Sequence, residues 1–241
     1  YMVVEKEKTL GFYETPDCSF SSILQKMADQ QQISGWIQND YYHSVSDPDR
    51  WKITQTYLAP KKILLIDRDG VINQKASQGQ YISSWEEFEW ILDTRNAMKL
   101  LSENGFRFIV ITNQAGIARG MFNLDNLERI HNKMKDELQR DGIEIIDIYV
   151  CPHHWDEKCY CRKPNPGMLY QASKDHLLRL DKILFIGDDS RDCQAAEKAG
   201  CNSIFVGQAS ELNRLSKNEQ PIYHSQLLTN SITNIKGYYN Q

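Results

Sequence analysis

From residue 61 onward, short apolar segments alternate with amphipathic segments of helical period, and this alternation limits the fold more than any other feature. The run 62–67 (KILLID) is apolar on both sides, as expected of a strand buried on both faces of a sheet. The segment 94–104 instead places its apolar residues on one helical face and is followed by Gly105, a common helix stop. The sequence therefore predicts an α/β fold with a doubly wound, Rossmann-like parallel sheet.

The same pattern predicts five strands and the helices that connect them. The strands are expected at 62–67, 106–112, 143–151, 182–187 and 203–206. The helices are expected at 94–104, 124–139, 166–178 and 190–199. A short strand signal at 221–224 and a helix at 225–235 follow, and we expect this end of the chain to close the sheet edge. Five β/α units in about 145 residues predict one compact domain, assigned to 61–241.

The first 60 residues follow a different pattern. The segment 21–31 is helical in character, 35–45 is aromatic and strand-like, and Asp47-Pro48 opens a helix that stops at Ala59-Pro60. This part contains no cluster of chemically reactive side chains. We expect residues 1–60 to be an accessory segment, used for packing or self-association.

Charge and hydropathy restrict the partners. The formal net charge is -4, whereas nucleic acid and anionic membranes select a clustered basic surface. No apolar run reaches the roughly 20 residues that span a bilayer, and the first residues contain no signal-peptide core. These features predict a cytoplasmic protein that binds neither nucleic acid nor membrane. A phosphorylated small molecule remains compatible, because a few cations in one pocket suffice to bind it.

Acidic residues follow two of the predicted strands. Asp67 and Asp69 come directly after the first strand and face the same way, and Gly70 lets the backbone turn sharply. Asp188 follows the fourth strand. In open α/β sheets the ligand binds outside the carboxyl ends of the strands, so Asp67 and Asp188 converge if the two strands are neighbours.

Such crowded carboxylates predict a bound Mg²⁺, which prefers oxygen ligands and shields them from each other and from a phosphate. Asp67 is then placed to attack phosphorus, and Asp69 to protonate the leaving alcohol and later to activate water. Taken alone, the Asp-x-Asp-Gly motif is read equally well as a turn with capping aspartates.

Further polar residues follow the other strands. Thr112 and Asn113 end the second strand and can bind phosphoryl oxygens without adding charge. Lys163 precedes the helix at 166–178 and can neutralise a transferring phosphate, while Arg162 can form a two-pronged contact with a second phosphate. Arg119, between two glycines, can orient its loop or meet the substrate. Taken alone, Thr112 and Asn113 can also be explained as a turn before a helix, and Arg119, Arg162 and Lys163 as solvated surface cations.

Three cysteines and a histidine lie together in the segment 151–161. Cys-x-His and Cys-x-Cys pairs separated by five residues can complete a tetrahedral zinc site; its predicted ligands are Cys151, His153, Cys159 and Cys161. Because the protein fills all four positions, the ion is expected to be structural and to hold Arg162 and Lys163 over the active site. The alternative is a set of unrelated thiols.

In this order, the motifs resemble those of the haloacid dehalogenase superfamily. Asp67-Arg68-Asp69-Gly70-Val71 is similar to its first motif, Thr112-Asn113 to its second, Lys163 to its third and Gly187-Asp188-Asp189 with Asp192 to its fourth. The zinc segment resembles that of histidinol-phosphate phosphatases and of D-glycero-D-manno-heptose 1,7-bisphosphate phosphatases. The stretches 81–90 (YISSWEEFEW), 112–120 (TNQAGIARG) and 151–168 are closer to the heptose enzymes.

The resemblance implies a magnesium-dependent phosphatase with an aspartyl-phosphate intermediate and a minimal cap. It makes Asp67 the nucleophile and Asp69 the acid and base. The implied magnesium ligands are the side chains of Asp67 and Asp188 and the carbonyl of Asp69. Thr112, Asn113 and Lys163 would hold the transferring phosphate, and Arg162 would engage the substrate.

Three hypotheses remain open at this point. The first is a phosphatase that converts heptose 1,7-bisphosphate to heptose 1-phosphate. The second is a histidinol-phosphate phosphatase, favoured by the five-residue gap in the zinc segment and by Asp189, where heptose enzymes usually carry lysine. The third is a non-catalytic, zinc-stapled binding module. The stretch 42–58 also resembles the tail of sugar-phosphate nucleotidyltransferases, which suggests a nucleotide-sugar pathway, but no glycine-rich start for transferase activity is present.

Overall fold

The computed structural model describes residues 6–12, 19–33 and 45–240. The chain divides into two compact units, Tyr1–Ser46 and Asp47–Gln241. The first contains helices α1 (Lys6–Leu10) and α2 (Phe20–Asp29), while the strand-like segment predicted at 35–45 lies, except for Val45, outside the described residues. The accessory role of residues 1–60 stays a prediction. Among the described residues, no helix has both the length and the apolar character that crossing a membrane requires.

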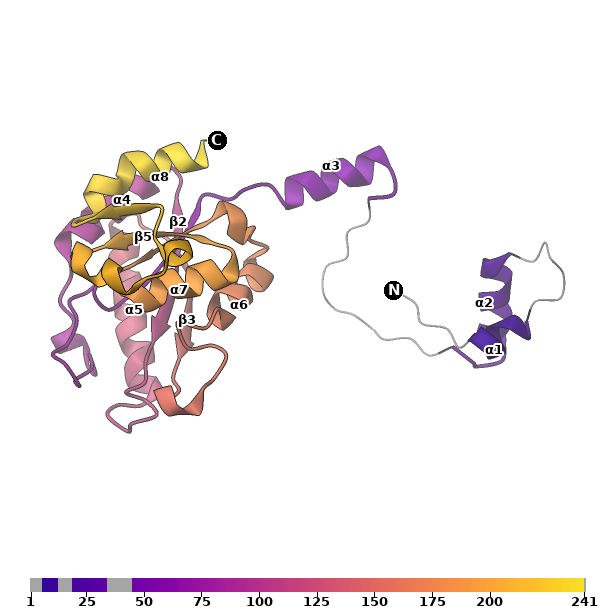
Figure 1. Ribbon diagram of the computed structural model, residues 1–241, viewed down its shortest axis with the longest axis horizontal. Helices are drawn as coiled ribbons and strands as arrows, with labels where there is room; N and C mark the ends of the chain where they lie inside the picture. Colours follow the sequence, from indigo (N-terminus) through magenta and orange to yellow (C-terminus); the bar gives the residue numbers. More distant parts are fainter. Residues whose placement is uncertain (1–5, 13–18, 34–44, 241) are drawn as a thin grey trace. The chain divides into compact units, whose positions relative to one another are not determined.

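The second unit is built on a parallel sheet flanked by helices (Figure 1). Its strand order is β3-β2-β1-β4-β5-β6. Its strands are β1 (Ile63–Ile66), β2 (Arg107–Asn113), β3 (Ile145–Cys151), β4 (Leu184–Gly187), β5 (Asn202–Val206) and β6 (Tyr223–Ser225). The predicted doubly wound parallel sheet is confirmed, but it has six strands rather than five. The short signal at 221–224 forms β6, which pairs in parallel with β5.

Helices and short 3-10 turns precede, connect and follow these strands. The helices are α3 (Pro48–Tyr57), α4 (Leu92–Ser102), α5 (Leu124–Arg140), α6 (Gly167–His176), α7 (Ser190–Ala199) and α8 (Ile232–Tyr239). The 3-10 turns are η1 (Trp85–Glu87), η2 (Trp155–Glu157), η3 (Leu180–Lys182), η4 (Ala209–Arg214), η5 (Lys217–Glu219) and η6 (Leu228–Ser231). Helix α7 ends where the sequence predicts, because Gly200 adopts a φ of 70° that suits glycine.

Apolar side chains cover both faces of the sheet, as the uninterrupted strand sequences require. Leu64 and Ile66 of β1 pack with the buried residues of α4, α5 and α8. Ile63 and Leu65 point to the opposite face and pack with those of α6 and α7. This alternation gives two hydrophobic layers, one on each side of the sheet.

The strand order brings three chain segments together at the carboxyl edge of the sheet. β1 lies between β2 and β4, with Leu65 in register with Ile109 on one side and with Phe185 on the other. The residues that follow β1, β2 and β4 therefore meet at one edge. The segment 67–91 contains only η1 and two isolated bridges, Asp69–Asn73 and Asn73–Trp90, so no cap domain is inserted there.

Candidate active site

Three carboxylates converge beyond the ends of β1 and β4. Asp67 follows β1, Asp188 follows β4 and Asp192 lies in the first turn of α7; one oxygen from each falls within 4.8 Å of the others. Asp67 and Asp192 are buried, and Asp188 is partly buried. The sequence predicts that Asp67 and Asp188 converge if their strands are neighbours. β1 and β4 are neighbours in the sheet, and the two carboxylates lie together.

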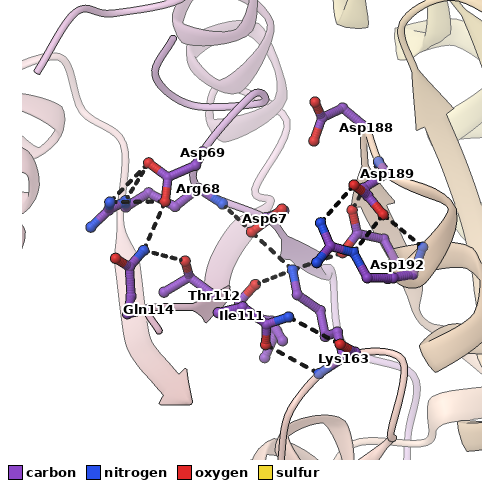
Figure 2. Close-up of polar contacts among 12 residues, drawn as sticks. Asp67, Arg68, Asp69, Ile111, Thr112, Gln114, Lys163, Asp188, Asp189 and Asp192 are labelled. Carbon is purple, nitrogen blue, oxygen red and sulfur yellow. Dashed lines mark hydrogen bonds and ion pairs between the residues drawn. The ribbon is translucent and has the colours of Figure 1, made fainter. Parts of the chain in front are cut away.

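Lys163 is the cation at the centre of this cluster. Its Nζ lies 2.9 Å from Oδ1 of Asp67 and 2.7 Å from Oδ1 of Asp192, and it donates to the carbonyl of Ile111 at 2.9 Å (Figure 2). Burial alone would lower the pKa of Lys163, but Asp192 and Asp67 outweigh it and raise that pKa. The side chain of Asn113 holds the main chain of Lys163 through two 3.1 Å hydrogen bonds.

Lys163 does not fully neutralise the carboxylates. Burial raises the pKa of Asp67 to about 7, against the opposing pull of Lys163. Burial also raises the pKa of Asp188 to about 6, although Lys75 Nζ lies 2.6 Å from its Oδ2. The Oδ1 of Asp188 is buried and has no hydrogen-bond partner among the described residues. This orphaned oxygen within a carboxylate cluster fits a hard divalent cation.

Gly70 allows the segment after β1 to lie close to Asp188, which follows β4. Its φ is +96°, and a Cβ at this position would lie 2.1 Å from Oδ2 of Asp188. Any other residue would therefore strain the backbone and push Asp188 away from Asp67.

Asp69 points to a different set of partners. Its carboxylate accepts hydrogen bonds from Arg68 Nη2 at 2.8 and 2.9 Å and from Gln114 Nε2 at 2.7 Å (Figure 2). It also accepts one from Asn73 Nδ2 at 3.0 Å. Burial alone would raise the pKa of Asp69, but Arg68, Asn73 and Gln114 outweigh it and hold the pKa below its usual value. The Asp69 side chain is therefore ionised and lies outside the acidic cluster, so its predicted metal ligand can only be the main-chain carbonyl.

A buried histidine supports this arrangement from behind. Arg68 is fully buried, and its Nη1 donates to Nε2 of His131 on α5 at 3.1 Å. Burial and the Arg68 charge lower the pKa of His131 to about 3, so its ring is neutral and accepts the bond. Arg68 is thus fixed from two sides, between His131 and Asp69.

A cavity of about 530 Å³ opens over these groups. The predicted residues on its lining are Asp67, Asp69, Thr112, Asn113, Arg119, Arg162 and Lys163. Of the predicted carboxylates, Asp188 lines an adjacent cavity with Lys75. The Arg119 guanidinium lies 5.6 Å from the ring centre of Tyr81 and 5.5 Å from that of Trp155, while Arg162 Nη1 donates to the carbonyl of His153 at 3.4 Å.

Three residues at this site have no predicted role from the sequence alone. The sequence could have indicated Asp192, because it lies one helical turn beyond Asp188 and Asp189. Gln114 directly follows Asn113, and its amide joins Thr112 Oγ1 to Asp69. The sequence could not have indicated Lys75, because only the folded chain places it against Asp188.

The predicted zinc ligands form a compact cluster. The Sγ atoms of Cys151, Cys159 and Cys161 lie 3.3–3.5 Å apart, and Nδ1 of His153 lies 3.2 Å from Cys161 Sγ and 3.7 Å from Cys151 Sγ. A regular tetrahedron with zinc–sulfur bonds of about 2.3 Å has sulfur–sulfur edges of about 3.8 Å. The three thiols are not joined by disulfides. A Cys₃His donor set of this size fits a structural zinc ion.

Comparisons with known proteins agree with these features. The family model described as polynucleotide kinase 3 phosphatase matches residues 62–226. D-glycero-beta-D-manno-heptose-1,7-bisphosphate 7-phosphatase of Pseudomonas putida is 39% identical over 145 residues, which cover 60% of this chain and 82% of that protein. The histidine biosynthesis bifunctional protein HisB of Campylobacter jejuni is 35% identical over 150 residues, covering 62% of this chain and 43% of that protein.

A solved structure extends the likeness to three dimensions. The D,D-heptose 1,7-bisphosphate phosphatase of B. bronchiseptica, complexed with magnesium and phosphate, superposes with a TM-score of 0.66 at 30% identity. The superposition covers 73% of this chain and 98% of that one. The chain therefore belongs to the polynucleotide kinase 3 phosphatase family, among the haloacid dehalogenase-like phosphatases that include heptose bisphosphate phosphatases and HisB.

Proposed function

We propose that the protein is a magnesium-dependent phosphatase that converts D-glycero-D-manno-heptose 1,7-bisphosphate to heptose 1-phosphate. The relative from Pseudomonas putida, which is 39% identical, is named as a 7-phosphatase of this bisphosphate. The related structure from B. bronchiseptica contains magnesium and phosphate. The carboxylate cluster and the cationic cavity beside it support the same reaction in this chain.

Asp67 is the proposed nucleophile. Mg²⁺ would be held by the side chains of Asp67 and Asp188 and by the carbonyl of Asp69, and it supplies the charge that shields Asp67 from the phosphate. An Asp67 oxygen bonds to phosphorus as the bond from phosphorus to the sugar oxygen breaks. Thr112, Asn113 and Lys163 bind the transferring phosphate, with Lys163 already 2.9 Å from Asp67.

Asp69 is the proposed acid and base. In the first step it protonates the departing sugar oxygen, and in the second it takes a proton from the water that attacks the aspartyl phosphate and frees Asp67. The partners of Asp69 hold it ionised, which suits the second step. For the first step it must carry a proton, and the negative charge of an arriving phosphate raises its pKa in that direction.

One observation carries the choice of substrate. Arg119 and Arg162 line the same cavity as Asp67, and neither has a carboxylate partner among the described residues. Such cations attract a second phosphate and oppose the protonated amine of histidinol phosphate. The bisphosphate is therefore the better match, although the relationship to HisB makes histidinol phosphate the natural competitor.

The zinc ion is proposed to be structural. Its four ligands come from the protein, and Arg162 and Lys163 directly follow the last of them, Cys161. Fixing the segment 151–161 would restrict both cations to the edge of the cavity.

A substrate panel with Mg²⁺ tests the proposal. We expect the highest kcat/KM for one anomer of heptose 1,7-bisphosphate, with release of the 7-phosphate only. Both anomers, heptose 7-phosphate and histidinol phosphate should be compared under the same conditions. A clear preference for histidinol phosphate would reverse the assignment, and release of no phosphate from any ester would leave the third hypothesis, a binding module.

A further inference from the structure

We propose that Arg191, which has no role in the reaction above, is a specificity residue that forms a clamp with Arg162 for the second, non-reacting phosphate of the substrate. This inference rests on the proposed function and deepens it, because it assigns the group that recognises a substrate with two phosphates. Asp189 acts as a positioning residue that holds Arg191.

The clamp lies where two cavities meet. The cavity over Asp67 and a neighbouring one of about 390 Å³ share four lining residues, Trp155, Arg162, Lys163 and Arg191. Three of the four are cations, and they come from two separate segments, the one after the zinc ligands and the start of α7. A substrate with one phosphate at Asp67 can therefore extend past Lys163 toward both arginines.

Lys163 is not available to a second phosphate. Its Nζ faces Asp67, Asp192 and the Ile111 carbonyl, and the residue is 2% exposed, so it can serve only the phosphate that is transferred at Asp67. The second phosphate must then bind cations farther along the cavity. Arg162 is partly exposed, and the one described hydrogen bond of its side chain is to the main-chain carbonyl of His153, so its charge is not neutralised.

Arg191 is held in place without being enclosed. Its Nε and Nη2 donate to the two oxygens of Asp189, each at 2.8 Å, and the Asp189 side chain also accepts from the main-chain nitrogen of Arg191 at 3.0 Å. The Arg191 side chain nevertheless remains 49% exposed. The two side-chain hydrogen bonds of this bidentate pair use Nε and Nη2 but not Nη1. Because a guanidinium has five N–H donors, donors remain for a ligand. A cation that is already fixed loses less conformational freedom when it binds an anion.

The decisive experiment compares two substrates that differ only in the second phosphate. In Arg191→Met, we expect KM for heptose 1,7-bisphosphate to rise about tenfold, the usual scale for losing one charged hydrogen-bonding partner at a partly exposed site. The KM for heptose 7-phosphate and both kcat values should stay unchanged. Arg191→Lys should recover part of the loss, because it keeps the charge but not the fork.

Arg179→Met is the matched control. Arg179 pairs with Asp181 at the same two-residue spacing, through Nε and Nη2, but it lines neither cavity. It should leave both KM values unchanged. If Arg191→Met alters the two substrates equally, or alters neither, the clamp is refuted.

A reporter assay separates the failure of the clamp from the failure of the proposed function. With p-nitrophenyl phosphate as substrate, fructose 1,6-bisphosphate and fructose 6-phosphate are compared as competitive inhibitors. The clamp predicts that Arg191→Met weakens inhibition by the bisphosphate alone, whether or not the wild type hydrolyses heptose bisphosphate. Equal inhibition constants in the wild type and the variant would reject the clamp independently of the natural substrate.

Discussion

The zinc segment and the carboxylate cluster are both candidate metal centres, but they are built in opposite ways. The four zinc ligands lie within residues 151–161, so a single loop brings them together. The carboxylates come from the end of β1 and from residues 188 and 192 beyond β4, so only the sheet order unites them. One centre is local in the sequence and the other depends on the whole fold.

The two centres also differ in how their charge is balanced. Lys163 and Lys75 already contact the carboxylates, whereas the zinc ligands are three thiols and one imidazole. Four protein ligands saturate a zinc ion, while the carboxylates leave positions for water and phosphate. We therefore expect zinc to maintain structure and magnesium to enable chemistry, and four changes test this contrast.

The largest effect is expected from Asp67→Asn. Loss of the nucleophile should lower kcat for phosphate release by at least about a thousandfold, because the amide cannot form the aspartyl phosphate. Zinc content and the circular dichroism spectrum should not change. Asp175→Asn, an exposed carboxylate bonded to Gln171 and Tyr149, is the control. Phosphate release that persists in Asp67→Asn would refute the nucleophile.

Metal removal should separate the two centres next. Cys161→Ser should lose zinc and lower the free energy of unfolding by more than about 2 kcal/mol, because zinc binding contributes to folding. Removing Mg²⁺ from the wild type should abolish activity without a comparable fall in thermal stability, and adding it back should restore activity. Zinc analysis and thermal denaturation check this, and equal stability losses from the two metals would contradict the contrast.

A smaller effect is expected at Lys75, whose Nζ forms an ion pair with Oδ2 of Asp188 at 2.6 Å. Lys75→Met should raise the affinity for Mg²⁺ by up to about tenfold, because a competing cation is removed from a ligand of the metal. Titration of Mg²⁺ without substrate measures this, and Lys99→Met, an exposed lysine on α4, serves as the control. A weaker affinity in Lys75→Met would show that Lys75 supports the metal site instead.

The smallest effect concerns His131 and pH. Its pKa in the folded chain is about 3, below the ordinary 6.5, so the unfolded chain binds a proton that the folded chain excludes. This contribution to stability is present above pH 6.5 and is lost as pH falls toward 3. Between pH 7 and 5.5 the wild type should lose about 1 kcal/mol of unfolding free energy through this group.

His131→Gln isolates that contribution, because glutamine keeps an acceptor for Arg68 and does not titrate. Urea unfolding of both proteins at the two pH values gives the difference. An identical loss in the variant and the wild type would mean that His131 is not buried in its neutral form.

The contrast between the two centres also explains which residues could be predicted. Cys151, His153, Cys159 and Cys161 were identifiable as one cluster because a short loop limits how far its ligands can separate. Lys75 was not, because its contact with Asp188 joins two loops that the sequence does not relate. The sequence predicted a sheet of five strands and not six for a similar reason. β6 has only three residues and is defined by its pairing with β5.

The sequence by itself determined the parallel α/β architecture, because strands buried on both faces must be uniformly apolar and the helices between them amphipathic. It also determined the chemical character of the residues at the strand ends. Only the tertiary structure decided that β1 lies beside β4, that Asp69 turns toward Arg68 and Gln114, and that Arg191 reaches the same cavity as Arg162. These are contacts between distant segments, and their geometry depends on strand order and side-chain packing rather than on local sequence.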